Sequence, residues 1–290
     1  QKLRLLSAAM SYATQAIFIT QHDGSIIWCN RALMHLSGYS EQEILHSTPH
    51  FFSAGNYDPA LWQNMWQQIL HGKEWSGDVL NLNKSGETYH VWQSITPLYD
   101  QQGSVNNFLC VQQDVTEKKA LEQKIEYLAY HDALTGLPNR LLFNDRMRQM
   151  LNQAKREHLQ FALLFVDLDG FKAVNDNQGH AAGDELLKLV AKRLGSCVRE
   201  ADTVARLGGD EFVILLRDAS DKLGLKLIAQ KIIESLAAPY NLSVGSANIS
   251  ASMGISRYPS DALAPERLMS CADEAMYQAV IPPQISHRHK

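Results

Sequence analysis

The chain has 290 residues, of which 45% are hydrophobic and 20% are charged, and its formal net charge is -4. This length and composition indicate a globular protein with room for two domains. The acidic balance argues against a nucleic-acid partner, because domains that bind nucleic acid carry a basic patch or stripe.

The cysteines and the apolar runs indicate the cellular compartment of the protein. Four cysteines are scattered without metal-ligand spacing, which favours a reducing, cytoplasmic setting. No apolar run in this chain approaches the ~20 residues of a membrane-spanning helix. Because the sequence begins at Gln1 and not at methionine, we also consider that it is the cytoplasmic part of a larger, membrane-anchored protein.

The first third of the chain is rich in predicted strands. Two β-type runs flank a turn at residues 22–25, and a short helix is expected to end at Gly38, where glycine accepts a left-handed cap. A second helix is predicted over residues 59–70. Three further strands follow, so we predict an α+β unit with an antiparallel sheet and short helices; its five strands are expected at residues 15–20, 26–30, 75–81, 88–98 and 105–113.

Several segments of this region match a known sensor family. They are residues 20–24, 28–32, 37–40 and 113–117. They resemble a PAS domain, and the resemblance covers nearly all of residues 7–117. It implies a sensor of a ligand, a cofactor or a partner, which we assign to residues 1–116.

The same region is similar to the flavin-binding branch of PAS domains. That similarity implies FAD, with Trp75 and Asn81 beside the isoalloxazine ring, and an asparagine offers both a donor and an acceptor. The alternative is that the tryptophans only form core. The reactive cysteine of the photochemical type has no counterpart in residues 47–51, so redox sensing is expected. Haem is the second candidate cofactor, with an axial ligand from among His46, His50 and His71.

A charged segment with an apolar seam links the two halves. Leu121, Ile125 and Leu128 have the 4-then-3 spacing of a short coiled coil, which predicts a helical linker over residues 117–131. A surface helix docked on its own domain would look similar. We expect the linker helix and the PAS domain to form a homodimer.

Carboxylates follow two predicted strands in the remainder, residues 132–290. The apolar run 161–166 predicts a buried strand, and Asp167 and Asp169 come directly after it, before Gly170. A second pair, Asp210 and Glu211, follows two glycines in a predicted hairpin turn. Carboxylates beside glycine suit Mg²⁺ and phosphate groups.

Two polar residues lie further along. Asn175 follows the first carboxylate pair, and Asp184 is expected at the start of a helix over residues 185–194. An amide and a carboxylate can bind the edge of guanine, because the carboxylate accepts hydrogen bonds from guanine N–H groups.

Residues 131 to about 280 closely resemble a GGDEF domain, the diguanylate cyclase family. The resemblance implies a five-stranded sheet flanked by helices, related to nucleotidyl cyclases and the polymerase palm, and the condensation of two GTP into cyclic di-GMP and pyrophosphate. Each domain holds one GTP, so a dimer is required. The matching segments are residues 132–140, 167–172, 175–176, 179–180, 183–184, 208–212 and 272–277.

The resemblance also assigns roles to residues. Asp167, Asp210 and the carbonyl of Leu168 would bind Mg²⁺ or Mn²⁺, and Asp210 or Glu211 would act as general base. The remaining assignments place the triphosphate on Gly170, Phe171 and Lys172 and guanine on Asn175 and Asp184.

An R-x-x-D segment precedes the hairpin. Arg199 and Asp202 match the position of the family's inhibitory site, which binds the product cyclic di-GMP. Lys231 is expected to add a basic contact. An ordinary salt-bridged turn is the simpler interpretation of this short pattern.

The end of the chain departs from the family pattern. The resemblance implies a lysine directly after residues 277–279 and a Gly-Arg pair a few residues later, both basic side chains contacting the GTP phosphates. Val280 stands in place of the lysine, Pro282 and Pro283 end the predicted helix, and the basic residues of 287–290 are out of place. The loss of two phosphate contacts predicts weakened turnover. The alternative function is therefore a receptor for GTP or cyclic di-GMP that regulates an attached domain.

Overall fold

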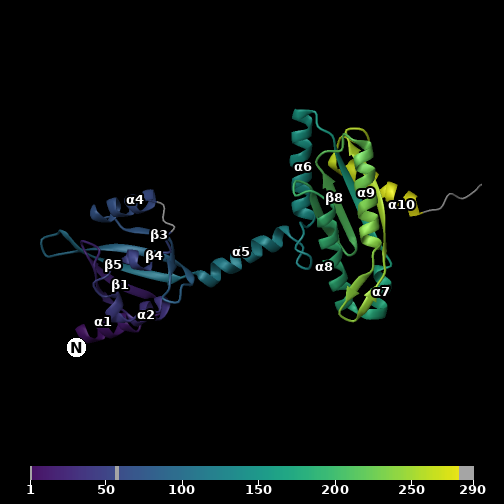
Figure 1. The fold of residues 1–290 in the computed structure, drawn as a ribbon. Helices are drawn as coiled ribbons and strands as arrows, with labels where there is room; N and C mark the ends of the chain where they lie inside the picture. Colours follow the sequence, from purple (N-terminus) through teal and green to yellow (C-terminus); the bar gives the residue numbers. More distant parts are fainter. Residues whose placement is uncertain (1, 56–58, 281–290) are drawn as a thin grey trace, which may run out of the picture. The chain divides into compact units, whose positions relative to one another are not determined.

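The computed structural model describes residues 2–55 and 59–280, and the chain forms two compact units, residues 1–124 and 125–290 (Figure 1). The proline pair and the basic tail discussed above lie outside the described residues. No helix among the described residues combines the length and the apolar character that crossing a membrane requires.

The first unit is built on a five-stranded antiparallel sheet with the strand order β2-β1-β5-β4-β3. All five predicted strands and both predicted helices are present, and Gly38 has the left-handed φ of 75° that caps α2. The strands are β1 (Ala16–Gln21), β2 (Ile26–Cys29), β3 (Trp75–Leu82), β4 (Thr88–Tyr99) and β5 (Val105–Asp114), and the helices are α1 (Lys2–Ser11), α2 (Arg31–Ser37), α3 (Glu41–Ile44) and α4 (Pro59–Leu70).

One face of this sheet carries the core of the unit. Phe18, Ile95 and Phe108 project from three different strands and are at most 4% exposed. They pack in one cluster with residues of the helices, among them Leu33 of α2 and Met65 of α4. The alternation of buried and exposed side chains along β4 and β5 follows from the period of two in a strand.

Helix α5 (Thr116–Tyr130) follows β5 and covers the predicted linker. None of its residues is buried. Leu121, Ile125 and Leu128 of the predicted seam are 56%, 59% and 41% exposed.

The second unit has a four-stranded antiparallel sheet with the order β11-β6-β8-β7. The expectation of five strands in this sheet is wrong for the described residues, because the two further short strands pair only with each other. The strands are β6 (Phe161–Asp169), β7 (Thr203–Gly208), β8 (Glu211–Leu216), β9 (Tyr240–Leu242), β10 (Gly245–Ala247) and β11 (Ser250–Tyr258), and the helices are α6 (Arg140–Glu157), α7 (Phe171–Gln178), α8 (His180–Cys197), α9 (Lys222–Ala237) and α10 (Pro265–Val280).

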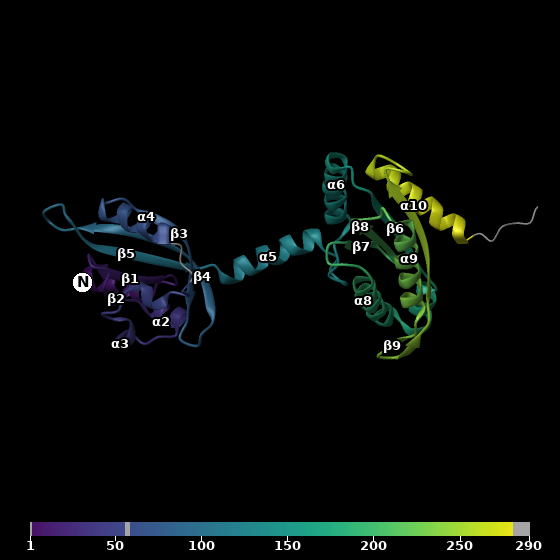
Figure 2. The same cartoon turned by 45° about the horizontal axis from the view of Figure 1, so that its top comes forward.

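Helices cover both faces of this sheet (Figure 2). Even-numbered residues of β6, such as Leu164, pack in a core with α8 and α9, and odd-numbered residues, such as Leu163, pack in a second core with α6 and α10. This arrangement explains the uninterrupted apolar run of β6, since each face of the strand is buried. The polar end of β6 emerges where this burial stops.

Candidate active site

The four carboxylates predicted from the sequence meet at one end of the second sheet. Asp167 and Asp169 are the last odd-numbered residues of β6, and Glu211 pairs with Asp167 across the β6–β8 ladder. Asp210 lies in the turn itself, because Gly208 and Glu211 form the last pair of β7 and β8. The glycines were expected to form the turn, whereas the two turn residues are Gly209 and Asp210.

The negative charges of the four carboxylates favour a bound cation. Burial raises the pKa of Asp167, and the neighbouring charges of Asp210, Asp169 and Glu211 raise it further. Like charges that are kept this close favour a bound divalent ion, which would offset their repulsion. Oxygen ligands of this kind match Mg²⁺ or Mn²⁺.

The metal ligands assigned from the sequence would form an open set. Asp167 and Asp210 supply carboxylates, and the backbone carbonyl of Leu168 lies between Asp167 and Asp169 on the same strand. Within residues 2–55 and 59–280, no group of three or more His, Cys, Asp or Glu side chains is placed to hold a metal by itself. The remaining coordination positions would therefore fall to the phosphates of a nucleotide and to water.

Serine side chains from β11 fix one of the four carboxylates. The hydroxyl groups of Ser250 and Ser252 donate to Asp169 over 3.0–3.1 Å. Because Asp169 is held by the neighbouring strand, it is the least available of the four for binding a metal. The sequence did not point to these serines, since they lie 81 and 83 residues further along the chain.

An arginine missed by the sequence reasoning holds the turn that carries Asp210. The guanidinium of Arg206 donates to the carbonyl of Gly209 through Nε (3.0 Å) and Nη2 (2.8 Å). Its Nη1 also donates to Asp132 over 3.0 Å. Burial alone would raise the pKa of Asp132, but hydrogen bonds from Thr135 and Arg206 outweigh burial and lower it. Arg206 thus connects the loop after α5 to the turn beside the carboxylates.

A second arginine reaches the carboxylates from the start of α6. Arg140 lies 3.9 Å from Glu211, and both side chains are about half exposed, at 60% and 46%. An ion pair of this length and exposure contributes little stability. It leaves Glu211 free to contact a bound metal or a substrate hydroxyl.

The predicted phosphate-binding segment follows Asp169 directly. Gly170 has a left-handed φ of 89° and caps the N-terminus of α7, whose first residues are Phe171 and Lys172. The first backbone N–H groups of a helix have no partner within it and favour an anion. Lys172 is exposed and belongs to no ion pair that the described residues show. These positions are suited to a triphosphate.

Asn175 and Asp184 are brought together by the packing of α7 against α8. Asp184 is exposed, and it lies inside α8, which begins at His180; the prediction that it starts a helix is wrong. The amide of Asn175 lies directly over Gly183, where a Cβ atom would collide with its oxygen. Gly183 therefore leaves the space that the Asn175 side chain occupies. Gly183 belongs to a segment that matches the family, but its contact with Asn175 joins two helices and has no local sequence signal.

The predicted product-binding residues gather near the end of α8. Asp202 accepts hydrogen bonds from the backbone N–H groups of Arg199 and Arg217, each over 3.0 Å. Lys231 donates to the carbonyls of Ser196 and Cys197, which lie three and two residues before Arg199. The Arg199 side chain is exposed. The turn is well ordered by these bonds, and its basic groups face solvent.

A cavity of about 330 Å³ adjoins this turn. Its lining includes Asp202 together with Arg146 and Arg217, but neither Arg199 nor Lys231. Arg146 lies in α6 and Arg217 follows β8, so no local sequence pattern connects them with the R-x-x-D segment.

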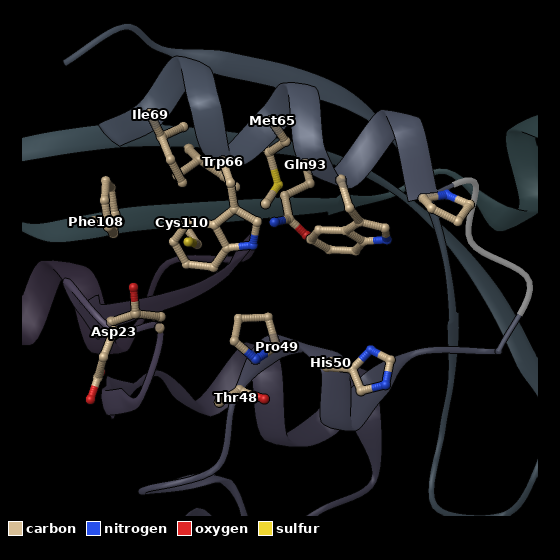
Figure 3. Close-up of a pocket in the computed structure, with 15 residues that line it drawn as sticks. Asp23, Thr48, Pro49, His50, Met65, Trp66, Ile69, Gln93, Phe108 and Cys110 are labelled. Atoms are coloured by element: carbon tan, nitrogen blue, oxygen red, sulfur yellow. The ribbon is translucent and has the colours of Figure 1, made fainter. Parts of the chain in front are cut away.

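The first unit contains a cavity of about 490 Å³ between α4 and the sheet (Figure 3). Met65, Trp66 and Ile69 of α4 line one side, and Thr48–His50 face them. Strands β4 and β5 contribute Gln93, Phe108 and Cys110, and Asp23 of the turn between β1 and β2 also lines the cavity.

The predicted flavin contacts do not line this cavity. Trp75 is 8% exposed and its ring lies over Gly77 of its own strand. Asn81 is buried, and its backbone forms a bridge with Ser53. Of the three histidines considered for haem, only His50 lines the cavity.

Comparison with protein families assigns both units. Residues 129–280 match the family model described as diguanylate cyclase, GGDEF domain, and residues 14–117 match a PAS domain model.

Curated relatives and a solved structure agree with these matches. The bifunctional diguanylate cyclase/cyclic di-GMP phosphodiesterase MucR of Pseudomonas aeruginosa is 51% identical over 152 residues, which are 52% of this chain and 22% of MucR. The probable diguanylate cyclase DgcE of Escherichia coli is 37% identical over 256 residues, which are 87% of this chain and 23% of DgcE. This chain therefore spans about a fifth to a quarter of the length of these two relatives. The GGDEF domain structure of TpbB (YfiN) from Pseudomonas aeruginosa is 45% identical with a TM-score of 0.50, and the match covers 51% of this chain and 87% of that one.

The matched residues include all four carboxylates at the sheet end, the phosphate-binding segment of α7 and the turn held by Arg206. The chain belongs to the GGDEF family of diguanylate cyclases and carries a PAS domain ahead of its GGDEF domain.

Proposed function

We propose that this chain is a sensor-regulated diguanylate cyclase that condenses two GTP into cyclic di-GMP and pyrophosphate. The observation that carries the proposal is the open cluster of Asp167, Asp210 and Glu211 beside the N-terminus of α7. The family match and the diguanylate cyclase names of the relatives support it.

The proposed reaction is two phosphoryl transfers of the same kind. The 3′-oxygen of one GTP attacks the α-phosphorus of the other, and the bond from that phosphorus to the bridging oxygen breaks, which releases pyrophosphate. The hydroxyl proton passes to a base. The same exchange in the opposite direction closes the ring.

Each residue of the site has a role in this proposal. Mg²⁺ or Mn²⁺ held by Asp167, Asp210 and the Leu168 carbonyl would neutralise the triphosphate and acidify the attacking hydroxyl. Asp210 or Glu211 would accept the proton, and Glu211 could also complete the metal shell. Lys172 stabilises the charge on the phosphates, together with the backbone N–H groups at Gly170 and Phe171.

Guanine recognition falls to α7 and α8. The Asp184 carboxylate accepts from the N–H groups of guanine, and the Asn175 amide can donate and accept at the same edge. Their adjacency across Gly183 supports this assignment. A base that lacks the exocyclic amine would leave the carboxylate short of a donor.

The reaction requires two GGDEF units, since each holds one GTP. The exposed seam of Leu121, Ile125 and Leu128 on α5 supports a homodimer through this helix, with the PAS domain adding to the interface. The exposed turn at Arg199 and Asp202, with Lys231 close by, is the proposed site of product inhibition.

The alternative function is a receptor that binds GTP or cyclic di-GMP without turnover. The observation in its favour is Val280, which ends α10 where the family pattern has a lysine. The chain then lacks the lysine contact to the triphosphate, one of the two phosphate contacts that the family pattern has after residue 279, although the carboxylates are intact.

Incubation of the full chain with GTP and Mg²⁺, followed by mass spectrometry and a pyrophosphate assay, separates the two functions. A cyclase forms two pyrophosphates for each cyclic di-GMP, and Asp167→Asn suppresses both products. Nucleotide binding by calorimetry without any cyclic di-GMP, at high enzyme and GTP concentrations, would establish the receptor instead.

A further inference from the structure

The carboxylate cluster projects from the face of its sheet that α6 and α10 cover (Figure 2). Asp167 continues the odd-numbered residues of β6 that pack with these helices, and Glu211 pairs with Asp167 across the ladder. Residues paired in this way have their side chains on the same face of a sheet. The ends of α6 and α10 therefore decide which groups surround a substrate at the cluster.

Helix α10 runs toward the carboxylate end of the sheet. Ser256 of β11 donates to the carbonyl of Leu268, and Gly254, two residues nearer the cluster along β11, lies against Met276. The helix is thus antiparallel to β11, and it ends at Val280. Its end has no cation at the position of the lysine in the family pattern.

Helix α6 begins at the same end of the sheet, and its first residue is Arg140. Residues 158–160 join α6 to β6, so the helix runs back along the strand toward the cluster. Asn139 fixes this helix start, because its side-chain oxygen accepts from two backbone N–H groups of α6 and its nitrogen donates to the carbonyl of Ala129 in α5. The backbone at Arg140 is therefore held, and its side chain is the part that can move.

The guanidinium of Arg140 has a weak partner. It lies 3.9 Å from Glu211, and the Arg140 side chain is 60% exposed. In the described part of the chain it forms no side-chain hydrogen bond, whereas Arg206 forms three. The donors of Arg140 are thus available to another anion at the cluster.

The order of the groups across the cluster indicates which anion that is. Lys172 and the N-terminus of α7, which bind the triphosphate in the proposed function, follow Asp169 on the β6 side. Arg140 approaches from the β8 side, next to Glu211. Since Asp210 or Glu211 would accept the proton of the attacking hydroxyl, this is the side on which the hydroxyl meets the α-phosphorus. The phosphate oxygens nearest to Arg140 are then those of the α-phosphate.

We propose that Arg140 leaves Glu211 when GTP binds and donates to the non-bridging oxygens of the α-phosphate. The planar guanidinium can donate to two such oxygens at once. The same contact stabilises the transition state, in which negative charge is spread over the oxygens of the reacting phosphorus. Arg140 thereby supplies a positive charge that α10 lacks at Val280. The inference rests on the proposed function, because it assumes that GTP occupies the cluster.

The test is calorimetry of the full chain with Mg²⁺ and two ligands, 3′-deoxy-GTP and pyrophosphate. 3′-Deoxy-GTP lacks the attacking hydroxyl and cannot be condensed, so its binding is measured whether or not the chain is a cyclase. Pyrophosphate lacks the α-phosphate. Arg140→Gln should weaken the binding of 3′-deoxy-GTP about tenfold, for one charged hydrogen bond, and leave the Kd of pyrophosphate unchanged. The Kd of Arg140→Lys for 3′-deoxy-GTP should lie between those of the wild type and Arg140→Gln, since an ammonium group keeps the charge but not the planar fork.

The matched control is Arg148→Gln. Arg148 is exposed two turns further along α6, and its guanidinium donates to the carbonyl of Asn144 in the same helix. This variant should bind both ligands as the wild type does. Far-UV circular dichroism checks that each variant is folded, and little stability is lost in Arg140→Gln because a long, exposed ion pair contributes little.

Steady-state kinetics with GTP provide a second readout. The kcat/KM of Arg140→Gln should fall at least about tenfold, with partial recovery in Arg140→Lys and an unchanged inhibition constant for pyrophosphate. The proposal is overturned by an unchanged Kd of Arg140→Gln for 3′-deoxy-GTP, by an equal weakening of pyrophosphate binding, or by the same loss in Arg148→Gln. A wild type that forms no cyclic di-GMP but binds 3′-deoxy-GTP about tenfold more tightly than Arg140→Gln refutes the cyclase reaction alone, whereas a wild type that does not bind 3′-deoxy-GTP refutes both.

Discussion

Arg206 holds the turn that carries Asp210, and its replacement by methionine tests whether that hold matters for catalysis. The guanidinium makes three hydrogen bonds, two to the Gly209 carbonyl and one to Asp132. In the ion pair, the side chains of Arg206 and Asp132 are only 10% and 22% exposed, so solvent screens it weakly. Methionine keeps the length of the side chain but removes every donor.

The expected loss is about 2 kcal/mol, from ~1.5–3 kcal/mol for a charged hydrogen bond with a discount for the remaining exposure. If the same free energy is lost from transition-state stabilisation, kcat/KM for GTP falls about 30-fold. The melting temperature of this unit should fall by about 4–8 °C. The kcat/KM and the melting temperature of Arg206→Lys should lie between those of the wild type and Arg206→Met. An ammonium group cannot reach both acceptors as the planar guanidinium does.

The matched control is Arg257→Gln. Arg257 also pairs with an aspartate, Asp261, over 3.3 Å, but it lies at the opposite end of the β6–β11 ladder from Asp167. Steady-state pyrophosphate release and thermal unfolding are measured for all variants. A wild-type kcat/KM in Arg206→Met, or an equal loss of kcat/KM in Arg257→Gln, would refute the role of Arg206 in positioning the turn.

Three further predictions concern guanine binding, inhibition and dimer formation. Gly183→Ala displaces the Asn175 side chain, so one hydrogen bond to guanine is lost. The KM for GTP should rise about tenfold with little change in kcat, and an unchanged KM would show that Asn175 does not bind guanine. Arg199→Ala should weaken cyclic di-GMP binding in calorimetry by about tenfold or more and leave the initial rate unchanged, and retained inhibition would place the product elsewhere. Leu121→Glu with Ile125→Glu should give monomers in light scattering and an initial rate that rises with the square of enzyme concentration, whereas a stable dimer would exclude this seam.

Much of the active site could be predicted because it is encoded by neighbours in the sequence. The apolar run of β6 predicts a doubly buried strand, and a strand of that kind places Asp167 at a sheet end. The left-handed Gly170 that opens α7 is likewise a local feature. Such positions follow from strand and helix periodicity alone.

The contacts that support this site could not be predicted, since they join distant segments. Arg206 and Asp132 are 74 residues apart, and Ser252 is 83 residues from Asp169. No periodicity links such pairs. Their association depends on the strand order and on the path of the loop after α5.

The cavity of the PAS unit shows the same limit. Trp75 and Asn81 have the buried orientation expected of ligand contacts, but β3 is the edge strand of its sheet. The cavity lies over β4 and β5, where Gln93 and Cys110 project into it. Which strands are central is a property of the strand order and not of any one strand.

The most direct test of the cyclase proposal is the turnover number of the full chain with GTP and Mg²⁺, compared between wild type and Asp210→Asn. The account predicts cyclic di-GMP from the wild type and a fall of about 100-fold or more in the variant, which corresponds to ~2.7 kcal/mol of lost transition-state stabilisation. Equal turnover in the two proteins, or a wild type that binds GTP and forms no cyclic di-GMP, would contradict it.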